Sequence, residues 1–83
     1  MRLVKPGAER ERGIERAPVV SSVIRSIGYD ADHAVLEVEF VSGQVYRYHF
    51  VQRRTWNELM QSESKGRYFD AHIREKFPTA RLP

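Results

Sequence analysis

The stretch LEVEFVSGQVYRYHF, from Leu36 to Phe50, decides the fold of this chain. Its first five residues alternate apolar side chains with glutamates, which predicts a strand with one buried face. A second alternation follows Gly43, in which aromatic residues alternate with polar ones: Tyr46, Arg47, Tyr48, His49 and Phe50. Two alternating segments joined by a glycine-containing loop predict an antiparallel hairpin.

The length of the hairpin loop decides which way the tyrosines point. A two-residue turn at 42–43 would place Tyr46 and Tyr48 on the glutamate face, where they could stack nucleic-acid bases. A three-residue loop at 41–43, with Gly43 in the left-handed conformation, places them opposite Val38 and Leu36 on the apolar face. Matching of apolar faces favours the three-residue loop, because a one-residue shift reverses the whole strand. We therefore expect the tyrosines to pack in the core.

The residue between the tyrosines must then point the other way. Arg47 is expected on the open face of the sheet, beside Glu37 and Glu39. There a cross-strand ion pair is expected rather than a phosphate contact.

Further elements are expected on both sides of the hairpin. Residues 19–29 predict a first strand with an irregularity, since their apolar residues do not alternate cleanly, and residues 30–33 predict a turn. Thr55 and Glu58 form a capping-box pattern that predicts a helix start at Thr55. Trp56, Leu59 and Met60 would line the inner face of that helix.

A second helix is expected from Ser64, which can cap it, to a stop at Pro78. Phe69, Ile73 and Phe77 recur every four residues along it and predict its buried side. The chain is thus predicted to be an α+β domain. Its three-stranded antiparallel sheet is followed by two short C-terminal helices, which pack on one sheet face.

The N-terminal part differs in composition from the rest. Residues 1–18 mix basic and acidic side chains with glycine and proline and show no apolar face. We predict a flexible charged arm there, followed by one domain over residues 19–83.

Composition excludes several classes of function. With 83 residues and no cysteine, disulfide scaffolds, thiolate zinc sites and cysteine nucleophiles are ruled out. The sequence has neither an apolar run long enough to span a bilayer nor the apolar region of a secretory signal, so we expect a cytoplasmic protein. His33, His49 and His72 share no recognised metal-ligand spacing, and no nucleophile motif is present. We therefore expect no catalytic residues, no metal and no cofactor.

The charge pattern points instead to a polyanion. The net charge is +3, and the positive excess lies at the two ends of the chain. Arg67 and Arg74 are two helical turns apart, and Ser64 with the N–H groups of Lys65 and Gly66 would form a helix N-terminus that favours anions. The predicted nucleic-acid-binding residues are Ser64, Lys65, Gly66, Arg67, Arg74 and Arg81, with Tyr46, Tyr48 and Tyr68 as candidate aromatic contacts. The alternative is a solvated helix face on which Asp70 pairs with Arg74.

Several motifs in order resemble the KTSC domain, which occurs at the C-terminus of some lysyl-tRNA synthetases and as small stand-alone bacterial and phage proteins. The resemblance covers roughly residues 21–82 and rests on these segments: Ser21–Ile24, Ile27–Asp30, Leu36–Phe40, Tyr46-Arg47-Tyr48, Ser64–Phe69 and His72–Arg74. It implies an α+β fold and an RNA-binding role. The chain departs from the family at Asp70, where asparagine is more common.

These observations together favour a small non-enzymatic module that binds RNA or another polyanion through the basic C-terminal helix. The alternative is a protein-interaction adaptor that docks on a larger bacterial or phage machine through the open sheet face or the arm.

Overall fold

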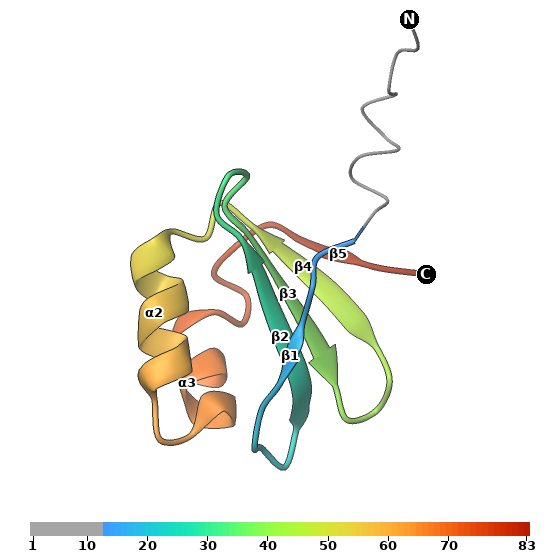
Figure 1. The fold of residues 1–83 in the computed structure, drawn as a ribbon, viewed down its shortest axis with the longest axis vertical. Coiled ribbons are helices and arrows are strands. Elements are labelled where there is room, and N and C mark those ends of the chain that lie inside the picture. The colour runs from blue at the N-terminus through green and yellow to red at the C-terminus, as the bar shows by residue number, and fades with distance from the viewer. Residues whose placement is uncertain (1–12) are drawn as a thin grey trace, which may run out of the picture.

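The computed structural model describes residues 13–83 as an antiparallel sheet with two helices (Figure 1). The sheet has five strands, and their spatial order follows the sequence. The strands are β1 (Ala17–Pro18), β2 (Ile24–Asp30), β3 (Val35–Phe40), β4 (Val45–His49) and β5 (Thr79–Arg81). The helices are α2 (Arg53–Gln61) and α3 (Lys65–His72). The α+β class and three predicted strands are confirmed, whereas β1 and β5 were not predicted.

The β3–β4 hairpin has the three-residue loop. Val38 pairs with Tyr46 and Leu36 pairs with Tyr48. The Gly43 N–H donates to the Phe40 carbonyl at 2.8 Å. Gly43 has a φ of +100°, a conformation that a residue without Cβ adopts at little cost. The inward orientation of both tyrosines is therefore confirmed.

The predicted irregularity of the first strand is a β-bulge. Pairing between β2 and β3 shifts between Ile24 and Ser26, so one extra residue lies on β2. In the turn that follows, the Asp30 carboxylate accepts from the Asp32 N–H at 3.1 Å, as expected for an aspartate that starts a turn.

Helix α2 does not begin where the capping-box pattern predicted. It starts at Arg53, and its N-cap residue, Gln52, makes no side-chain capping bond. The predicted cap at Thr55 is wrong, because Thr55 lies inside the first turn of the helix, and Glu58 bonds to other residues. Its carboxylate accepts from the Tyr68 hydroxyl at 2.7 Å and from Arg54 at 3.3 Å.

Helix α3 has the predicted start but an earlier end. The Ser64 side chain accepts from the Arg67 N–H, which confirms the cap. The helix stops at His72, since the N–H groups of Ile73 and Arg74 both bond to the Phe69 carbonyl and Glu75 takes a φ of +60°. Phe77 therefore lies outside the helix, and the predicted stop at Pro78 is wrong. This early turn lets the chain pass back to the sheet and form β5.

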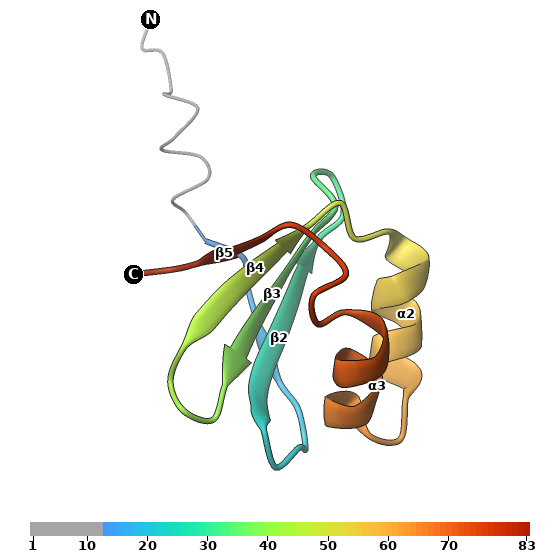
Figure 2. The same cartoon turned by 180° about the vertical axis from the view of Figure 1, so that it is seen from behind.

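The core lies between the sheet and the two helices, which cover the same sheet face (Figures 1 and 2). The predicted stripe of α2 and most of that of α3 contribute to it. Its buried members are Ile24, Ile27, Leu36, Val38, Tyr48, Val51, Leu59, Phe69 and Ile73. We call the opposite, helix-free side of the sheet the outer face.

The predicted arm of residues 1–18 is partly wrong. Ala17 and Pro18 pair with Ile27 and Ser26 of β2, so this segment belongs to the sheet. Residues 14 and 15 lie against Gly28, where an added Cβ would come 2.3 Å from the Glu15 carbonyl oxygen. Residues 1–12 of the predicted arm lie outside the described part of the chain.

Candidate functional site

The start of α3 holds four of the predicted binding residues: Ser64, Lys65, Gly66 and Arg67. Ser64 caps the helix, and the Lys65 ammonium donates to the Ser62 carbonyl at 2.9 Å. Gly66 faces Val23, because an added Cβ would lie 2.8 Å from a methyl group of that valine. Gly66 thus allows close packing of α3 against the residue that precedes β2. Arg67 is exposed and has no ion pair within residues 13–83.

Arg74 does not continue the line of Arg67 along the helix, because α3 ends at His72. Its guanidinium lies 3.4 Å from the Asp70 carboxylate, and both side chains are mostly exposed. An exposed pair of this kind contributes at most about 1 kcal/mol and does not prevent a phosphate from binding the arginine. Arg74 also borders a shallow groove of about 370 Å³ beside Val23, Phe40 and Val41.

The two tyrosines of β4 lie on the helix-facing side of the sheet. Tyr48 is 5% exposed, and its ring packs edge-on against Phe69 with a centroid distance of 5.3 Å. Its buried ring excludes base stacking by Tyr48. Tyr46 is half-buried between Phe40 and Tyr48, with ring centroids 5.9 and 6.5 Å away.

The Tyr48 hydroxyl is not fully buried, although the residue as a whole is only 5% exposed. The hydroxyl has no hydrogen-bond partner within residues 13–83. It is not among the fully buried side-chain oxygens of that range, because each of those has a partner. Burial raises the pKa of Tyr48 to about 12, the neighbouring Tyr46 adds to the rise, and the positive charge of Arg74 opposes it. The three groups are therefore electrostatic neighbours.

Arg81 lies next to this group. In the β4–β5 ladder it pairs with Tyr46, while Thr79 pairs with Tyr48. Paired residues point to the same side of a sheet, so Arg81 shares the face of the two tyrosines. It makes no ion pair with any described residue. We call Tyr46, Tyr48, Arg74 and Arg81 the tyrosine–arginine surface.

The structure thus brings together four of the nine predicted site residues and leaves five elsewhere. The start of α3 lies one helix length, about 12 Å, from the end at which Arg74 follows. The Tyr68 hydroxyl bonds to Glu58 of α2, and its ring packs against His72 of α3 with centroids 4.4 Å apart and planes inclined by 33°. This hydrogen bond and burial raise the pKa of Tyr68 to about 12, with burial as the larger cause.

The outer face carries the predicted ion pair and an unpredicted partner. Arg47 binds Glu37 at 2.7 Å, which confirms the cross-strand pair. Glu37 is nevertheless buried, because Arg16 binds its other carboxylate oxygen from the segment that precedes β1. An isolated arginine before Ala17 and Pro18 carries no sequence signal for this contact.

Phe50 is a second residue that the sequence did not reveal. The alternation with Tyr46 and Tyr48 extended the predicted strand to Phe50. Instead β4 ends at His49, and Phe50 has a φ of +65° and is 73% exposed.

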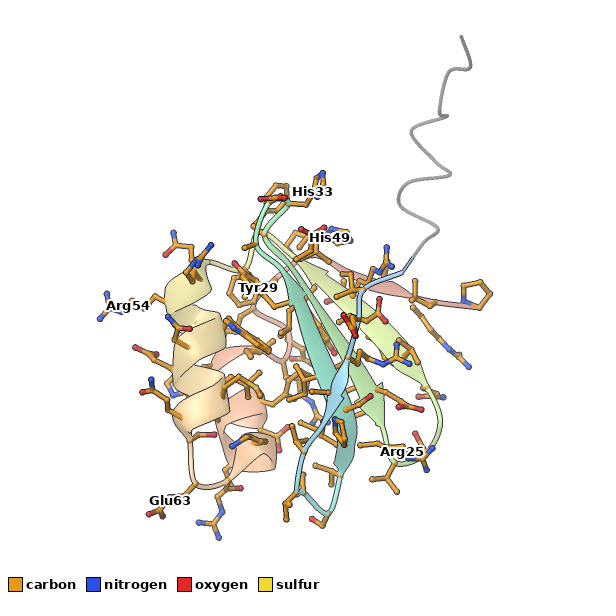
Figure 3. All side chains as sticks on the ribbon, viewed as in Figure 1. Arg25, Tyr29, His33, His49, Arg54 and Glu63 are labelled. Atoms are coloured by element: carbon orange, nitrogen blue, oxygen red, sulfur yellow. The ribbon has the colours of Figure 1, made fainter. Side chains whose placement is uncertain are left out.

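No metal-binding group emerges in the described part of the chain. His33 lies on the β2–β3 turn and His49 at the end of β4 (Figure 3), and His33 bonds to Asp30 at 2.8 Å. Within residues 13–83 no cluster of three or more His, Asp or Glu side chains could hold a metal ion. None of the helices in this range is long and apolar enough to span a membrane.

Comparison with known proteins assigns the chain to a family. The KTSC domain matches residues 20–77. A KTSC domain protein from Yersinia pestis has a similar structure, with a TM-score of 0.81 and 42% sequence identity over 86% of this chain and 100% of that chain. An uncharacterised protein of Stutzerimonas stutzeri is 42% identical over 69% of this chain and 80% of its own length. A lysine–tRNA ligase of Nostoc punctiforme is 36% identical over 74% of this chain but only 11% of the ligase. The chain belongs to the KTSC domain family.

Proposed function

We propose that this protein is a small non-enzymatic module that binds single-stranded RNA, or another polyanion, at the tyrosine–arginine surface. The observation that carries the proposal is the position of Arg81. It is a cation without an ion pair among the described residues, and it lies directly across the β4–β5 ladder from the half-buried Tyr46.

The chemistry of the four side chains suits a phosphodiester. Guanidinium groups such as those of Arg74 and Arg81 bind phosphate oxygens with two parallel hydrogen bonds. The Tyr48 hydroxyl adds an uncharged donor that stays protonated, because the pKa of Tyr48 is raised to about 12. The surface therefore offers cations and a neutral donor within one area.

Charge continues along the segment that forms this surface. Between the end of α3 and the C-terminus the chain carries Arg74, Lys76 and Arg81 against a single acid, Glu75. Arg67, one helix length away, is a further exposed cation that an extended strand of RNA can reach. Aromatic groups next to a basic stripe are typical of single-strand binding surfaces.

The relatives favour RNA among the polyanions. Two lysine–tRNA ligases contain a segment similar to this chain, at 36% and 38% identity. Each match spans 11% of the ligase, so the similarity concerns one small part of an enzyme whose name includes tRNA.

The proposal is tested by fluorescence anisotropy with a short labelled RNA that lacks secondary structure, at several salt concentrations. The variant Arg74→Gln, Arg81→Gln should bind more weakly, and its slope of log affinity against log salt should fall by about 0.7 for each phosphate that the variant no longer binds. The matched control is Arg53→Gln, Arg54→Gln, which removes the same charge from α2; Arg54 points away from the sheet (Figure 3). The single variant Arg67→Gln measures the contribution of the start of α3.

Two results would contradict the proposal. Equal slopes for the test and control variants would remove the tyrosine–arginine surface from the binding site. Absence of wild-type binding to any RNA would favour a protein-interaction adaptor, which a pull-down with and without nuclease then identifies.

A further inference from the structure

Arg16 is bound on the outer face of the sheet by three different acceptors. Its Nη1 atom forms an ion pair with Glu37, and its Nε atom donates to the Ser26 hydroxyl at 3.0 Å. Its Nη2 atom lies 3.9 Å from the Glu39 carboxylate. Two nitrogens of the guanidinium thus donate hydrogen bonds, and the third forms a longer ion pair.

These acceptors are held in place by contacts that do not involve Arg16. Glu37 bonds to Arg47 at 2.7 Å, and the Ser26 hydroxyl donates to Glu39 at 2.8 Å. The second oxygen of Glu39 lies 3.5 Å from Arg25. Strand pairing sets the spacing, since Ser26 pairs with Glu39 across β2 and β3. Strand pairing and these contacts therefore fix the positions of Glu37, Ser26 and Glu39.

Burial of Glu37 makes an unoccupied site energetically unfavourable. The Glu37 side chain is only 3% exposed, and that of Arg16 is 27% exposed. A buried carboxylate that loses a partner bears a desolvation penalty, so the site favours occupation by a cation. The acceptors at Glu37, Ser26 and Glu39 suit a planar guanidinium with several N–H groups, whereas an ammonium offers only one nitrogen.

The acceptors and their occupant come from different parts of the chain. The family match begins at residue 20 and includes all three acceptors, whereas Arg16 precedes it. Gly28 makes room for the preceding segment, because any side chain there would collide with the Glu15 carbonyl.

We propose that Glu37, Ser26 and Glu39 form a guanidinium-binding site on the KTSC domain, which this chain fills in cis with Arg16. The ligand class is the side chain of an arginine in an extended segment, and the occupant is the segment 13–18. This site lies on the opposite sheet face from the tyrosine–arginine surface and does not depend on RNA binding.

The test is chemical rescue in the full chain. Arg16→Ala removes the guanidinium with the two outer methylene groups, and ethylguanidinium replaces those atoms. The melting temperature of Arg16→Ala should be below that of the wild type and should rise with ethylguanidinium concentration until the site is saturated. Ethylammonium at the same ionic strength should give no such rise, and ethylguanidinium should not raise the melting temperature of the wild type.

A measurement on the wild type covers the case in which Arg16→Ala does not fold. The Nε proton of Arg16 should exchange with solvent markedly more slowly than that of the exposed Arg54 in nuclear magnetic resonance spectra. Fast exchange of Arg16, or equal rescue by ethylguanidinium and ethylammonium, would overturn the proposal. A dimeric mass in solution that Arg16→Ala converts to a monomer would overturn the cis assignment.

Discussion

Phe50 bears two unfavourable features at one residue. Its backbone is left-handed, which costs about 1–3 kcal/mol for a residue other than glycine, and its large apolar side chain is exposed. The neighbouring backbone fixes this conformation. The His49 N–H donates to the Pro78 carbonyl and the Val51 N–H to the Ala34 carbonyl, both at 2.9 Å.

Replacement of Phe50 should therefore stabilise the protein. Phe50→Asn should raise the free energy of unfolding by about 1 kcal/mol, because asparagine tolerates the left-handed region. Phe50→Ala is the matched control, since it also removes the exposed ring but keeps the backbone cost. Urea denaturation measures both variants. An Asn variant no more stable than the Ala variant would show that Phe50 is not strained.

Two substitutions of Tyr48 distinguish the contribution of its ring to stability from that of its hydroxyl to RNA binding. Tyr48→Ala should lower the free energy of unfolding by about 3–5 kcal/mol, because its ring is buried against Phe69. Tyr48→Phe keeps the ring and should leave stability within about 0.5 kcal/mol, while RNA affinity decreases. Denaturation and anisotropy measured on the same samples check both effects. Unchanged RNA affinity of Tyr48→Phe would exclude the hydroxyl from the binding site.

Two glycines test how closely the elements pack. In Gly28→Ala the new methyl group meets the Glu15 carbonyl oxygen, a backbone atom, at 2.3 Å. We expect a loss of about 1–3 kcal/mol as the segment 13–18 is pushed from the sheet. Gly66→Ala is the control, since its methyl group meets a valine side chain and the helical alanine recovers about 0.5–1 kcal/mol. A melting temperature of Gly28→Ala equal to that of the wild type would contradict the close contact at Gly28.

Elements whose residues face one core were predictable from the sequence. The β3–β4 register followed from matching Leu36 and Val38 with the tyrosines, because a shift would have exposed every apolar side chain of the strand. The same alternation placed Arg47 beside Glu37. The orientation of the two tyrosines could therefore be predicted from the alternation of apolar and polar residues.

Elements fixed by distant contacts were not predictable. β1 has two residues and β5 three, all of them exposed, so neither carries an apolar pattern. The early end of α3 depends on a left-handed Glu75, for which the sequence gives no glycine or asparagine signal. As a result, Arg74 was expected on the helix and Arg81 beyond its end. In the structure Arg81 lies on β5, which places it beside Tyr46.

At the scale of the whole molecule, tyrosine ionisation should limit stability at high pH. Burial raises the pKa of Tyr48 and of Tyr68 from 10 to about 12, with the neighbouring Tyr46 and Glu58 as further causes. The folded state therefore favours the protonated phenols. This contribution to stability is complete below about pH 10 and is lost as the pH rises to about 12.

The expected result is a fall in melting temperature between about pH 10 and 12 that accompanies the appearance of tyrosinate absorbance. The variant Tyr48→Phe, Tyr68→Phe should show a smaller fall over the same range, because the two phenols with the raised pKa values are absent. An identical pH profile for the variant and the wild type would assign the alkaline transition to other groups.

The two outermost strands also bear on how copies of the protein behave toward one another. A sheet edge with free N–H and C=O groups is a template for edge-to-edge aggregation. Here one edge is β1, which is two residues long and contains Pro18, a residue without an N–H group. The other is β5, which is three residues long and carries the positively charged Arg81. Both edge strands are thus too short to pair with a strand of another copy, and Pro18 and the charge of Arg81 make such pairing still less favourable. We therefore expect less edge-to-edge aggregation than for a sheet with the longer strands β2 and β4 at its edges.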